Sequence, residues 1–176
     1  MQSWSAALRA GRVCAAPAEG VYGYVADPFN PAALQGVLTV KNRVPTKGCI
    51  VLIQNREQLD QLCPTLPQSC TDAMATYWQL GQPPVTLILP ALPSLPEQLT
   101  GGMPTIAVRL PQPDYMQDYL KAVGQPVVST SLNLSGEPPA IRREEVPLDV
   151  PALTLPHPLS GTPSRIFNPV TGIWLR

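Results

Sequence analysis

Apolar positions recur at helical spacing in four stretches of the chain. Trp4, Ala7 and Leu8 would share one face of the first helix, and Pro31 suits the first turn of the second because it has no amide hydrogen to bond. In the third stretch, Gln58 follows an asparagine by three residues, as in a capping box. With caps at Ser3, Asn30, Asn55 and Asp114, the predicted helices cover residues 3–11, 30–41, 55–62 and 114–124.

Short apolar runs between these helices predict strands. The runs lie at residues 13–16, 49–53, 85–89, 105–110 and 127–128, and a hairpin is expected around 168–172. Residues 17–24 are expected to form a glycine-punctuated loop or an irregular strand, and the proline-rich stretch 138–163 has no clear pattern. Strands interleaved with helices predict an α/β domain, and prolines beside strands indicate edges rather than a regular doubly wound sheet.

Composition narrows the class of protein. The 176 residues suit one compact unit, so we expect a single domain over residues 1–176. Lys and Arg number 12, as do Asp and Glu, so the net charge is zero and gives no general attraction to nucleic acid. No apolar run approaches the roughly 20 residues that cross a membrane. The first residues lack the apolar core of a signal peptide, so we expect a cytoplasmic protein with no membrane partner.

The cysteines and the single histidine give no sign of a metal site. The cysteines lie at positions 14, 49, 63 and 70, and no two of them have the Cys-x-x-Cys spacing of a zinc site. In a chain without a leader we expect reduced and mostly buried thiols. His157 stands between two prolines and is a poor candidate for a base.

Three features could carry chemistry, and the first is the basic group Lys41, Arg43 and Lys47 just past the end of a predicted helix. Cations at such a place complement the helix dipole and are commonly solvated, which is the interpretation that the sequence alone favours. The alternative is a cationic clamp for phosphates, in which Arg offers a fork and Lys a point charge.

The second feature is the hydroxyl-rich run from Ser129 to Gly136, which contains Ser131 and Asn133. Small polar residues after a buried strand could simply build a turn. They could also present donors to an anionic ligand, because ligands bind at the carboxyl ends of strands in open α/β sheets. The two interpretations are evenly matched.

The third feature is Arg109, inside an otherwise apolar strand. A charge there is costly unless it is paired, so the side chain either faces water or holds a carboxylate, and its apolar neighbours favour the second. Glu19 and Asp27 could act as acids or bases, but a solvated role or a cap is the safer interpretation. The chain has neither a Gly-x-x-x-x-Gly-Lys-Ser/Thr phosphate loop nor a Gly-x-Ser-x-Gly elbow. We therefore expect positioning and charge stabilisation, with no catalytic nucleophile.

Five segments in order along the chain match a known set of motifs. They are Pro-Ala-Glu-Gly-Val-Tyr-Gly at 17–23, Lys-Asn-Arg-Val-Pro at 41–45, Ala-Val-Arg at 107–109, Ser-Thr-Ser-Leu-Asn-Leu-Ser-Gly at 129–136, and Pro-Ser-Arg-Ile at 163–166 with a terminal Leu-Arg. In these segments the sequence resembles the YrdC family, the threonylcarbamoyl-AMP synthases of tRNA modification. Ala18 and Gly20 stand where the family motif has threonines.

The resemblance implies an α/β fold with a twisted mixed β-sheet flanked by helices and a concave, positive cavity. It also implies a nucleotidyltransferase that makes threonylcarbamoyl-AMP and pyrophosphate from L-threonine, bicarbonate and ATP. Mg²⁺ would accompany the ATP, with ligands that the sequence does not identify. Further implied partners are a downstream threonylcarbamoyl transferase complex and tRNA or another structured RNA.

The resemblance implies roles for single residues as well. Arg109 would pair with the threonine carboxylate, and Gly20, Tyr22 and Ser129 would lie near the same substrate. No catalytic side chain and no metal ligand is implied. The implied ATP-binding set is Lys41, Arg43, Lys47, Thr105, Ser131, Asn133 and Arg176.

Two other functions stay open at this point. One is a divergent relative that keeps the cavity and binds a nucleotide or structured RNA without synthase activity. The other is a carbamoyl-adenylate domain, as in hydrogenase maturation. Such proteins also carry acylphosphatase and zinc-finger modules. This chain is too short to contain these modules, and its cysteines do not have the spacing of a zinc finger.

Overall fold

A single mixed sheet organises the chain. The structure is a computed structural model that describes residues 2–44, 46, 48–134 and 136–176. Within these residues, the sheet has eight strands in the order β1-β2-β6-β3-β5-β4-β7-β8. The strands are β1 (Cys14–Ala18), β2 (Val21–Ala26), β3 (Ile50–Leu52), β4 (Val85–Pro90), β5 (Thr105–Arg109), β6 (Val127–Ser131), β7 (Arg165–Asn168) and β8 (Ile173–Trp174).

Both kinds of strand pairing occur in this sheet. β3 pairs with β5 in parallel, and β4 pairs with β7 in parallel. The other neighbours are antiparallel, including β6 between β2 and β3. The predicted α/β fold with a mixed sheet is therefore confirmed.

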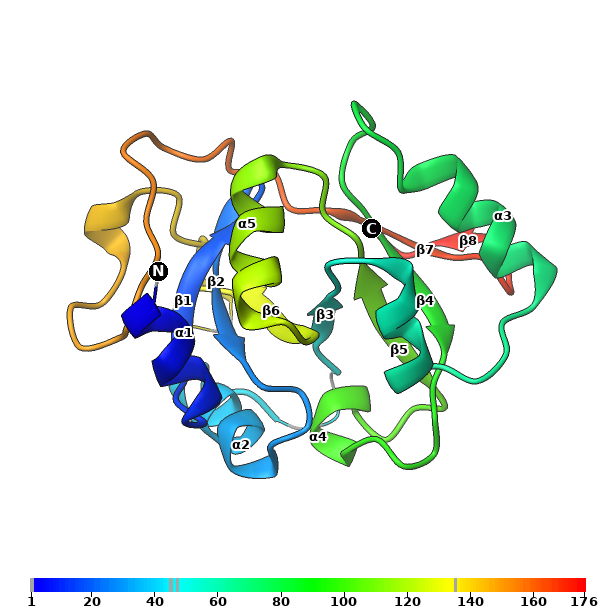
Figure 1. Cartoon of the computed structure of the whole chain (residues 1–176), viewed down its shortest axis with the longest axis horizontal. Helices are drawn as coiled ribbons and strands as arrows, with labels where there is room; N and C mark the ends of the chain where they lie inside the picture. The colour runs from blue at the N-terminus through cyan, green and yellow to red at the C-terminus, as the bar shows by residue number, and fades with distance from the viewer. Residues whose placement is uncertain (1, 45, 47, 135) are drawn as a thin grey trace.

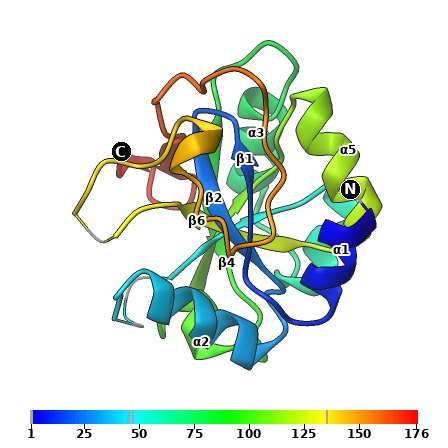
Figure 2. The ribbon, with the colours of Figure 1, turned by 90° about the vertical axis from the view of Figure 1, so that its left-hand side faces the viewer.

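Helices cover both faces of the sheet. They are α1 (Gln2–Arg9), α2 (Pro31–Val40), the 3₁₀ helix η1 (Arg56–Gln61), α3 (Gln68–Tyr77), α4 (Glu97–Thr100), α5 (Asp114–Val123) and the 3₁₀ helix η2 (Arg143–Glu145). α1 and α5 lie side by side against one face (Figures 1 and 2). α2, α3 and η1 pack on the other face, where their apolar residues join those of β3, β4 and β5 in the largest core cluster.

The helix pair α1 and α5 buries its apolar stripe as the spacing of apolar residues predicts. Trp4 and Tyr119 meet edge to face with ring centroids 5.5 Å apart, and Leu8 and Met116 are fully buried beside them. The indole of Trp4 donates a hydrogen bond to the carbonyl of Ala15, which joins α1 to β1. These contacts fix the helices over one half of their sheet face and leave the other half without a helix.

Several local predictions are confirmed at the level of single residues. The side chain of Asn30 accepts hydrogen bonds from the amides of Ala32 and Ala33, so it caps α2 as expected. The Asn55 side chain accepts from the amide of Gln58 and starts η1, although that element is a 3₁₀ helix. The strand predicted at 49–53 is present as β3 in the middle of the sheet, and the expected C-terminal hairpin is β7–β8.

Other local predictions are partly right or wrong. Residues 17–24, expected to form a loop or an irregular strand, follow the strand alternative: they contribute to the regular hairpin β1–β2, which turns at Glu19 and Gly20. Asp114 is the first residue of α5 rather than its cap, which is Pro113. Helices α3 and α4 were not predicted: neither starts with a side-chain cap, α3 buries only Cys70, Ala73 and Met74, and α4 is only 4 residues long.

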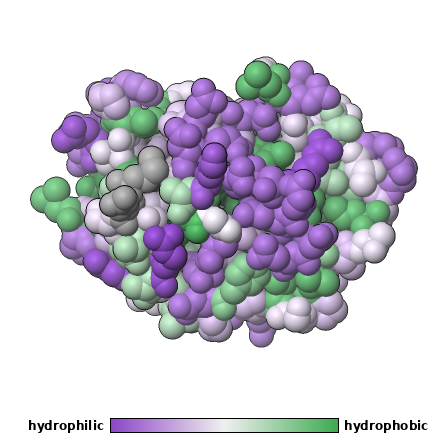
Figure 3. Space-filling model, viewed as in Figure 1, coloured by the Kyte–Doolittle hydropathy of each residue, from purple (hydrophilic) through white to green (hydrophobic). Residues whose placement is uncertain are grey.

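The surface is polar over much of the face seen in Figure 3, and its apolar residues form small, separate groups. All four cysteines are free and buried, as expected. Among the described residues, no helix has the length and apolar character needed to cross a membrane.

Candidate active site

A cavity of about 370 Å³ opens on the sheet face that carries α1 and α5. The strand register places Ser129 opposite both Val25 and Ile50, and Ile50 opposite Ala107, so these residues share that face. Val25 packs under α1 and α5, whereas Ser129, Ile50 and Ala107 line the cavity. The site is thus the half of the face that the two helices leave uncovered. Its volume falls in the range of small-molecule pockets.

Three arginines give the cavity its charge. Arg43, Arg109 and Arg176 all line it, and none of its described lining residues is an Asp or Glu. A concave site with cations on its walls and no acidic side chain concentrates anions. Hydroxyls supply further donors, from Thr100, Thr105, Ser129, Thr130, Ser131 and Ser164.

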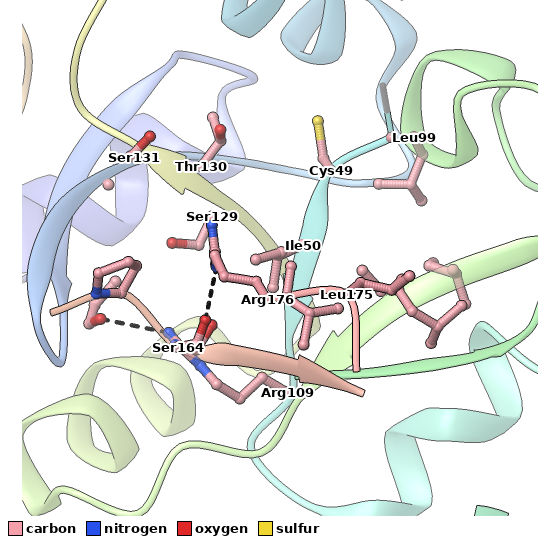
Figure 4. Close-up of a pocket in the computed structure, with 18 of the residues that line it drawn as sticks. Cys49, Ile50, Leu99, Arg109, Ser129, Thr130, Ser131, Ser164, Leu175 and Arg176 are labelled. Carbon is pink, nitrogen blue, oxygen red and sulfur yellow. Dashed lines mark hydrogen bonds between the residues drawn. The ribbon is translucent and has the colours of Figure 1, made fainter. Parts of the chain in front are cut away.

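The cavity has two ends (Figure 4). Thr130, Cys49 and Leu99 lie at one end, Arg109 and Ser164 lie at the other, and Ser129 and Ile50 lie between them. Cations are present at both ends. The site can therefore hold one extended anion or two ligands end to end.

Arg109 forms a buried ion pair with Glu19, whose carboxylate Oε2 is 3.3 Å from its Nη1. The two side chains are 6% and 13% exposed, so the pair is shielded from water. A second nitrogen, Nη2, donates to the carbonyl of Ala18 at 3.5 Å. In the described structure, Arg109 Nε and Glu19 Oε2 have no hydrogen-bond partner. The guanidinium is therefore anchored at one edge and keeps unused hydrogen-bonding capacity.

Burial also shifts the pKa of both members of this pair. Desolvation raises the pKa of Glu19, and the charge of Arg109 opposes that rise. Desolvation lowers the pKa of Arg109, and Glu19 opposes that change. Arginine stays protonated in proteins, so Arg109 remains a cation in the cavity wall. One carboxylate partner of Arg109 is thus supplied within the chain, and Glu19 is not the solvated residue that was one of the two roles expected for it.

Arg176, which follows the C-terminal hairpin β7–β8, lines the cavity. Its Nε donates to the carbonyl of Ser164 at 2.9 Å (Figure 4). The Ser164 hydroxyl is in turn 2.9 Å from the hydroxyl of Thr86 in the buried interior. Burial lowers the pKa of Arg176, and the neighbouring charge of Arg109 lowers it further. The two positive charges repel one another, and a bound anion would relieve that repulsion.

Arg43 approaches the other end of the cavity from the segment after α2. Its Nη1 donates to the hydroxyl of Thr130 at 3.3 Å, and its Nη2 donates to the carbonyl of Gly48 at 2.8 Å. Arg43 is half-buried, so it is not the solvated cation that the sequence alone favoured. The third member of the basic group, Lys47, lies outside the described residues.

Lys41 is also buried, at 3% exposure, but it does not line the cavity. Its ammonium donates to the carbonyl oxygens of Ser131 and Asn133 and to the side-chain oxygen of Asn133. Asn133 likewise bonds within the segment that follows β6 and is not a lining residue. Of the predicted ATP-binding set, the structure brings Arg43, Thr105, Ser131 and Arg176 to the cavity.

Two of the residues expected beside threonine are not at the cavity. Tyr22 alternates with the lining residues Val21 and Gly23 along β2, so its ring points to the opposite sheet face. There it is fully buried, and its hydroxyl accepts a hydrogen bond from the amide of Leu155 at 2.8 Å. The expectation that Tyr22 lines the threonine pocket disagrees with this geometry.

Gly20 instead packs against the segment that leads to the C-terminal hairpin. Its carbonyl accepts from the amide of Gly161 at 2.8 Å. A Cβ at position 20 would lie 1.7 Å from the carbonyl oxygen of Thr162, so no side chain fits there. Gly20 therefore admits the backbone of residues 160–162 and does not itself line the cavity.

Some lining residues had no assigned role in the sequence-based prediction. Thr130 lies inside the serine-rich motif, and Ser164 lies inside the Pro-Ser-Arg-Ile segment, so the motifs contained a signal for both. Cys49 also lines the cavity, where burial raises the pKa of its thiol. A protonated thiol is a weak nucleophile, so Cys49 does not contradict the expected absence of covalent chemistry.

The residues described here do not build a metal site of their own. No group of three or more His, Cys, Asp or Glu side chains in the described chain could hold an ion. Mg²⁺ is commonly bound through one or two carboxylates together with substrate phosphates, and the described cavity wall has none.

Comparison with known proteins points to one family. The family model Sua5_yciO_yrdC, described as telomere recombination, matches residues 6–168. The threonylcarbamoyl-AMP synthase of Hydrogenovibrio crunogenus is 38% identical over 169 residues, which cover 94% of this chain and 91% of that protein. The threonylcarbamoyl-AMP synthase of Vibrio parahaemolyticus is 39% identical over 142 residues, which cover 80% of this chain and 75% of that protein.

Solved structures agree with the sequence relatives. Sua5 of P. abyssi complexed with L-threonine is 26% identical, with a TM-score of 0.83 over 93% of this chain. The match covers 49% of the P. abyssi protein, so this chain spans about half of its length. E. coli YciO has a TM-score of 0.80 at 20% identity and covers 94% of this chain, which supports the fold alone.

Proposed function

Because this chain belongs to the Sua5/YciO/YrdC family, we propose that it makes threonylcarbamoyl-AMP and pyrophosphate from L-threonine, bicarbonate and ATP. The membership agrees with the resemblance seen in the sequence motifs. The observation that carries the proposal is the cavity itself, with three arginines and a row of hydroxyls and no acidic side chain among its described lining residues. All of the substrates, or their complexes with Mg²⁺, are anions or carry a carboxylate.

The reaction needs no side-chain nucleophile. The amine of threonine attacks the carbon of bicarbonate, and loss of water leaves a carbamate. A carbamate oxygen then bonds to the α-phosphorus of ATP while the bond to the departing pyrophosphate breaks. Holding the short-lived carbamate against ATP turns an encounter of several molecules into a local step. Cations in the wall stabilise the charge that develops on the phosphates.

We propose a division of the cavity between the two substrates that combines the roles implied by the resemblance with the residues that line the cavity. Arg109 and Ser129 would hold the carboxylate and neighbouring atoms of threonine. Thr105, Ser131 and Arg176 would bind the nucleotide, with Arg43 at the far end as a phosphate ligand. Lys47 stays a predicted phosphate ligand outside the described residues.

The wider setting follows from the product. Threonylcarbamoyl-AMP is a mixed anhydride, so we propose that a downstream threonylcarbamoyl transferase complex consumes it to modify tRNA. We also propose that residues 1–176 act as one domain, because one sheet passes through the described chain. We also propose that the protein works in the cytoplasm, where ATP and tRNA are found.

One assay separates this function from the alternatives. The protein is supplied with Mg²⁺, ATP, bicarbonate and threonine, and both pyrophosphate release and capture of labelled bicarbonate are measured. We expect both signals to require threonine. Release that ignores threonine would indicate a carbamoyl-adenylate activity. Binding of ATP with no release under any condition would indicate a binding protein and would contradict the proposal.

A further inference from the structure

Three aromatic rings meet where the C-terminal hairpin β7–β8 packs beside α3 (Figure 1). Tyr77, the last residue of α3, meets both Phe167 and Trp174 edge to face, with ring centroids 5.5 Å apart in each pair. The rings of Phe167 and Trp174 lie 4.7 Å apart. We call these three residues the aromatic cluster. The guanidinium carbon of Arg165 lies 3.7 Å from the centroid of the Trp174 ring, which is a cation–π contact.

The aromatic cluster lies on the sheet face opposite the cavity. Phe167 and Trp174 are paired across the hairpin, and their rings pack against the core that α2, α3 and η1 cover. Their chain neighbours Ile166 and Leu175 line the cavity. Because successive side chains of a strand point to opposite faces, one short stretch of backbone carries rings on one face and cavity wall on the other.

The backbone of this stretch has few hydrogen bonds to hold it. β8 has 2 residues and lies at the edge of the sheet, where its neighbour is β7. Past the paired residues, the amide of Leu175 donates to the carbonyl of Ile166 at 2.9 Å, and the amide of Ile166 donates to the carbonyl of Arg176 at 3.0 Å. A short edge strand opens readily unless side chains pack over it, so the aromatic cluster is what this hairpin needs.

Arg176 depends on the same backbone for its direction. It comes two residues after Trp174, and its side chain is exposed although it lines the cavity. Its Nε donates to the carbonyl of Ser164, the residue directly before β7. Both partners of that hydrogen bond therefore flank the hairpin, and a hairpin that opened would release Arg176 from the cavity wall.

We propose that Trp174 is a positioning residue that fixes the cavity wall from the opposite side of the sheet. Its ring, held in the aromatic cluster, anchors the backbone that carries Leu175 and Arg176. The cation–π contact with Arg165 strengthens this attachment. The effect on ATP rests on the proposed function, because it assumes that Arg176 binds the nucleotide. The ordering of the backbone does not rest on that function.

The first test measures order without any ligand. Hydrogen exchange is followed in wild type, Trp174→Ala, Trp174→Phe and the control Val170→Ala, which trims an exposed apolar side chain of the same hairpin. We expect the amides of Ile166 and Leu175 to exchange at least about tenfold faster in Trp174→Ala, because two aromatic pairs and a cation–π contact are lost. Trp174→Phe keeps a ring in the cluster, so it should stay within about threefold of wild type, as should Val170→Ala. The amide of Ile53, which bonds to β5, serves as a protected reference.

The second test uses double-mutant cycles on the affinity for Mg-ATP, measured by calorimetry at a temperature where every variant is folded. We expect Trp174→Ala to weaken binding by about fivefold and Trp174→Phe to bind like wild type. Because Trp174 acts through Arg176, the double variant with Arg176→Ala should be no weaker than Arg176→Ala alone. Combined with Arg43→Ala, at the other end of the cavity, the two losses should multiply.

Three results would overturn the inference. Unchanged exchange at Ile166 and Leu175 in Trp174→Ala would show that the ring does not hold this backbone. Exchange in Trp174→Phe as fast as in Trp174→Ala would show that the ring contacts are not the cause. Losses of affinity that multiply when Trp174→Ala is combined with Arg176→Ala would show that Trp174 does not act through Arg176. If wild type bound no ATP at all, the proposed function would fail, while the exchange result would still decide the structural part.

Discussion

The guanidinium of Arg109 in β5 and the carboxylate of Glu19 in the β1–β2 turn, 3.3 Å apart, form an ion pair shielded from water. Glu19 is held in the turn between β1 and β2 at a φ of +65°, a left-handed conformation that few residues other than glycine adopt. The turn therefore aims an acidic side chain at the one arginine of β5. This pairing fixes the cation before a substrate carboxylate arrives.

Glu19→Ala should destabilise the fold. It would leave Arg109 as a buried charge without its carboxylate, and loss of one partner of a buried pair costs about 3–5 kcal/mol. We expect the free energy of unfolding in urea to fall by about 3 kcal/mol. The double variant Glu19→Ala, Arg109→Met removes both charges and should recover most of that loss. A double variant as unstable as Glu19→Ala alone would contradict the ion-pair explanation.

Arg109→Ala should affect threonine more than ATP. If its guanidinium binds the carboxylate of the amino acid, the KM for threonine should rise by at least about tenfold, because a charge-assisted bond is lost. The KM for ATP should change much less. Steady-state assays with each substrate varied in turn measure the two values, at a temperature where the variant is folded. Equal effects on both substrates would count against the carboxylate role.

Arg43→Ala should give the reverse result. Its guanidinium reaches Thr130 and Gly48 at the opposite end of the cavity from Arg109. We expect the Kd for ATP to rise by about tenfold or more while the threonine requirement stays close to that of wild type. Calorimetric titration with Mg-ATP provides the measurement. An unchanged ATP affinity would remove Arg43 from the phosphate site.

Gly23→Ala should reproduce the defect of Ser129→Ala. A Cβ at position 23 would lie 2.7 Å from the Ser129 hydroxyl and 3.2 Å from the Thr130 carbonyl, so the hydroxyl must move. Overpacking of this kind costs about 1–3 kcal/mol of stability. We expect a raised KM for threonine in both variants, of similar size. A Gly23→Ala enzyme with wild-type threonine kinetics would show that Ser129 does not contact this substrate.

The free energy of unfolding should fall at alkaline pH, because the buried thiols are harder to deprotonate in the folded protein than in the unfolded chain. Burial raises the pKa of Cys14 from 9.0 to about 11 and that of Cys63 from 9.0 to about 12. Between pH 9 and pH 11 the folded protein therefore binds more protons than the unfolded chain, and stability falls as pH rises. We expect Cys63→Ala to show a shallower loss of unfolding free energy over this window. Equal slopes for wild type and variant would contradict this cause.

Much of the fold could be predicted from local sequence signals. The apolar run at β3 indicated a central strand, and the Asn30-Pro31 pair located the start of α2 correctly. These features depend on residues close together in sequence. α3 escaped prediction because its first residue follows Pro67 with no side-chain cap and its apolar stripe is short.

The site was predicted less completely, for two physical reasons. Motif membership does not give the direction of a side chain, and in a strand a step of one residue reverses the face, which is why Tyr22 lies away from the cavity while Gly23 lines it. Contacts between segments far apart in the chain also cannot be predicted from local sequence patterns. Nothing in the spacing of Glu19 and Arg109 indicated that they would meet.

The walls of the cavity differ in how firmly they are held. β6 is paired along both sides, by β2 and by β3, so Ser129 stands on a strand held inside the sheet. The opposite wall, with Ser164 and Arg176, belongs to a short hairpin near the margin of that sheet. Substitutions in the C-terminal hairpin can therefore change which substrates the cavity binds. They would leave β6, which aligns the reacting atoms, in place.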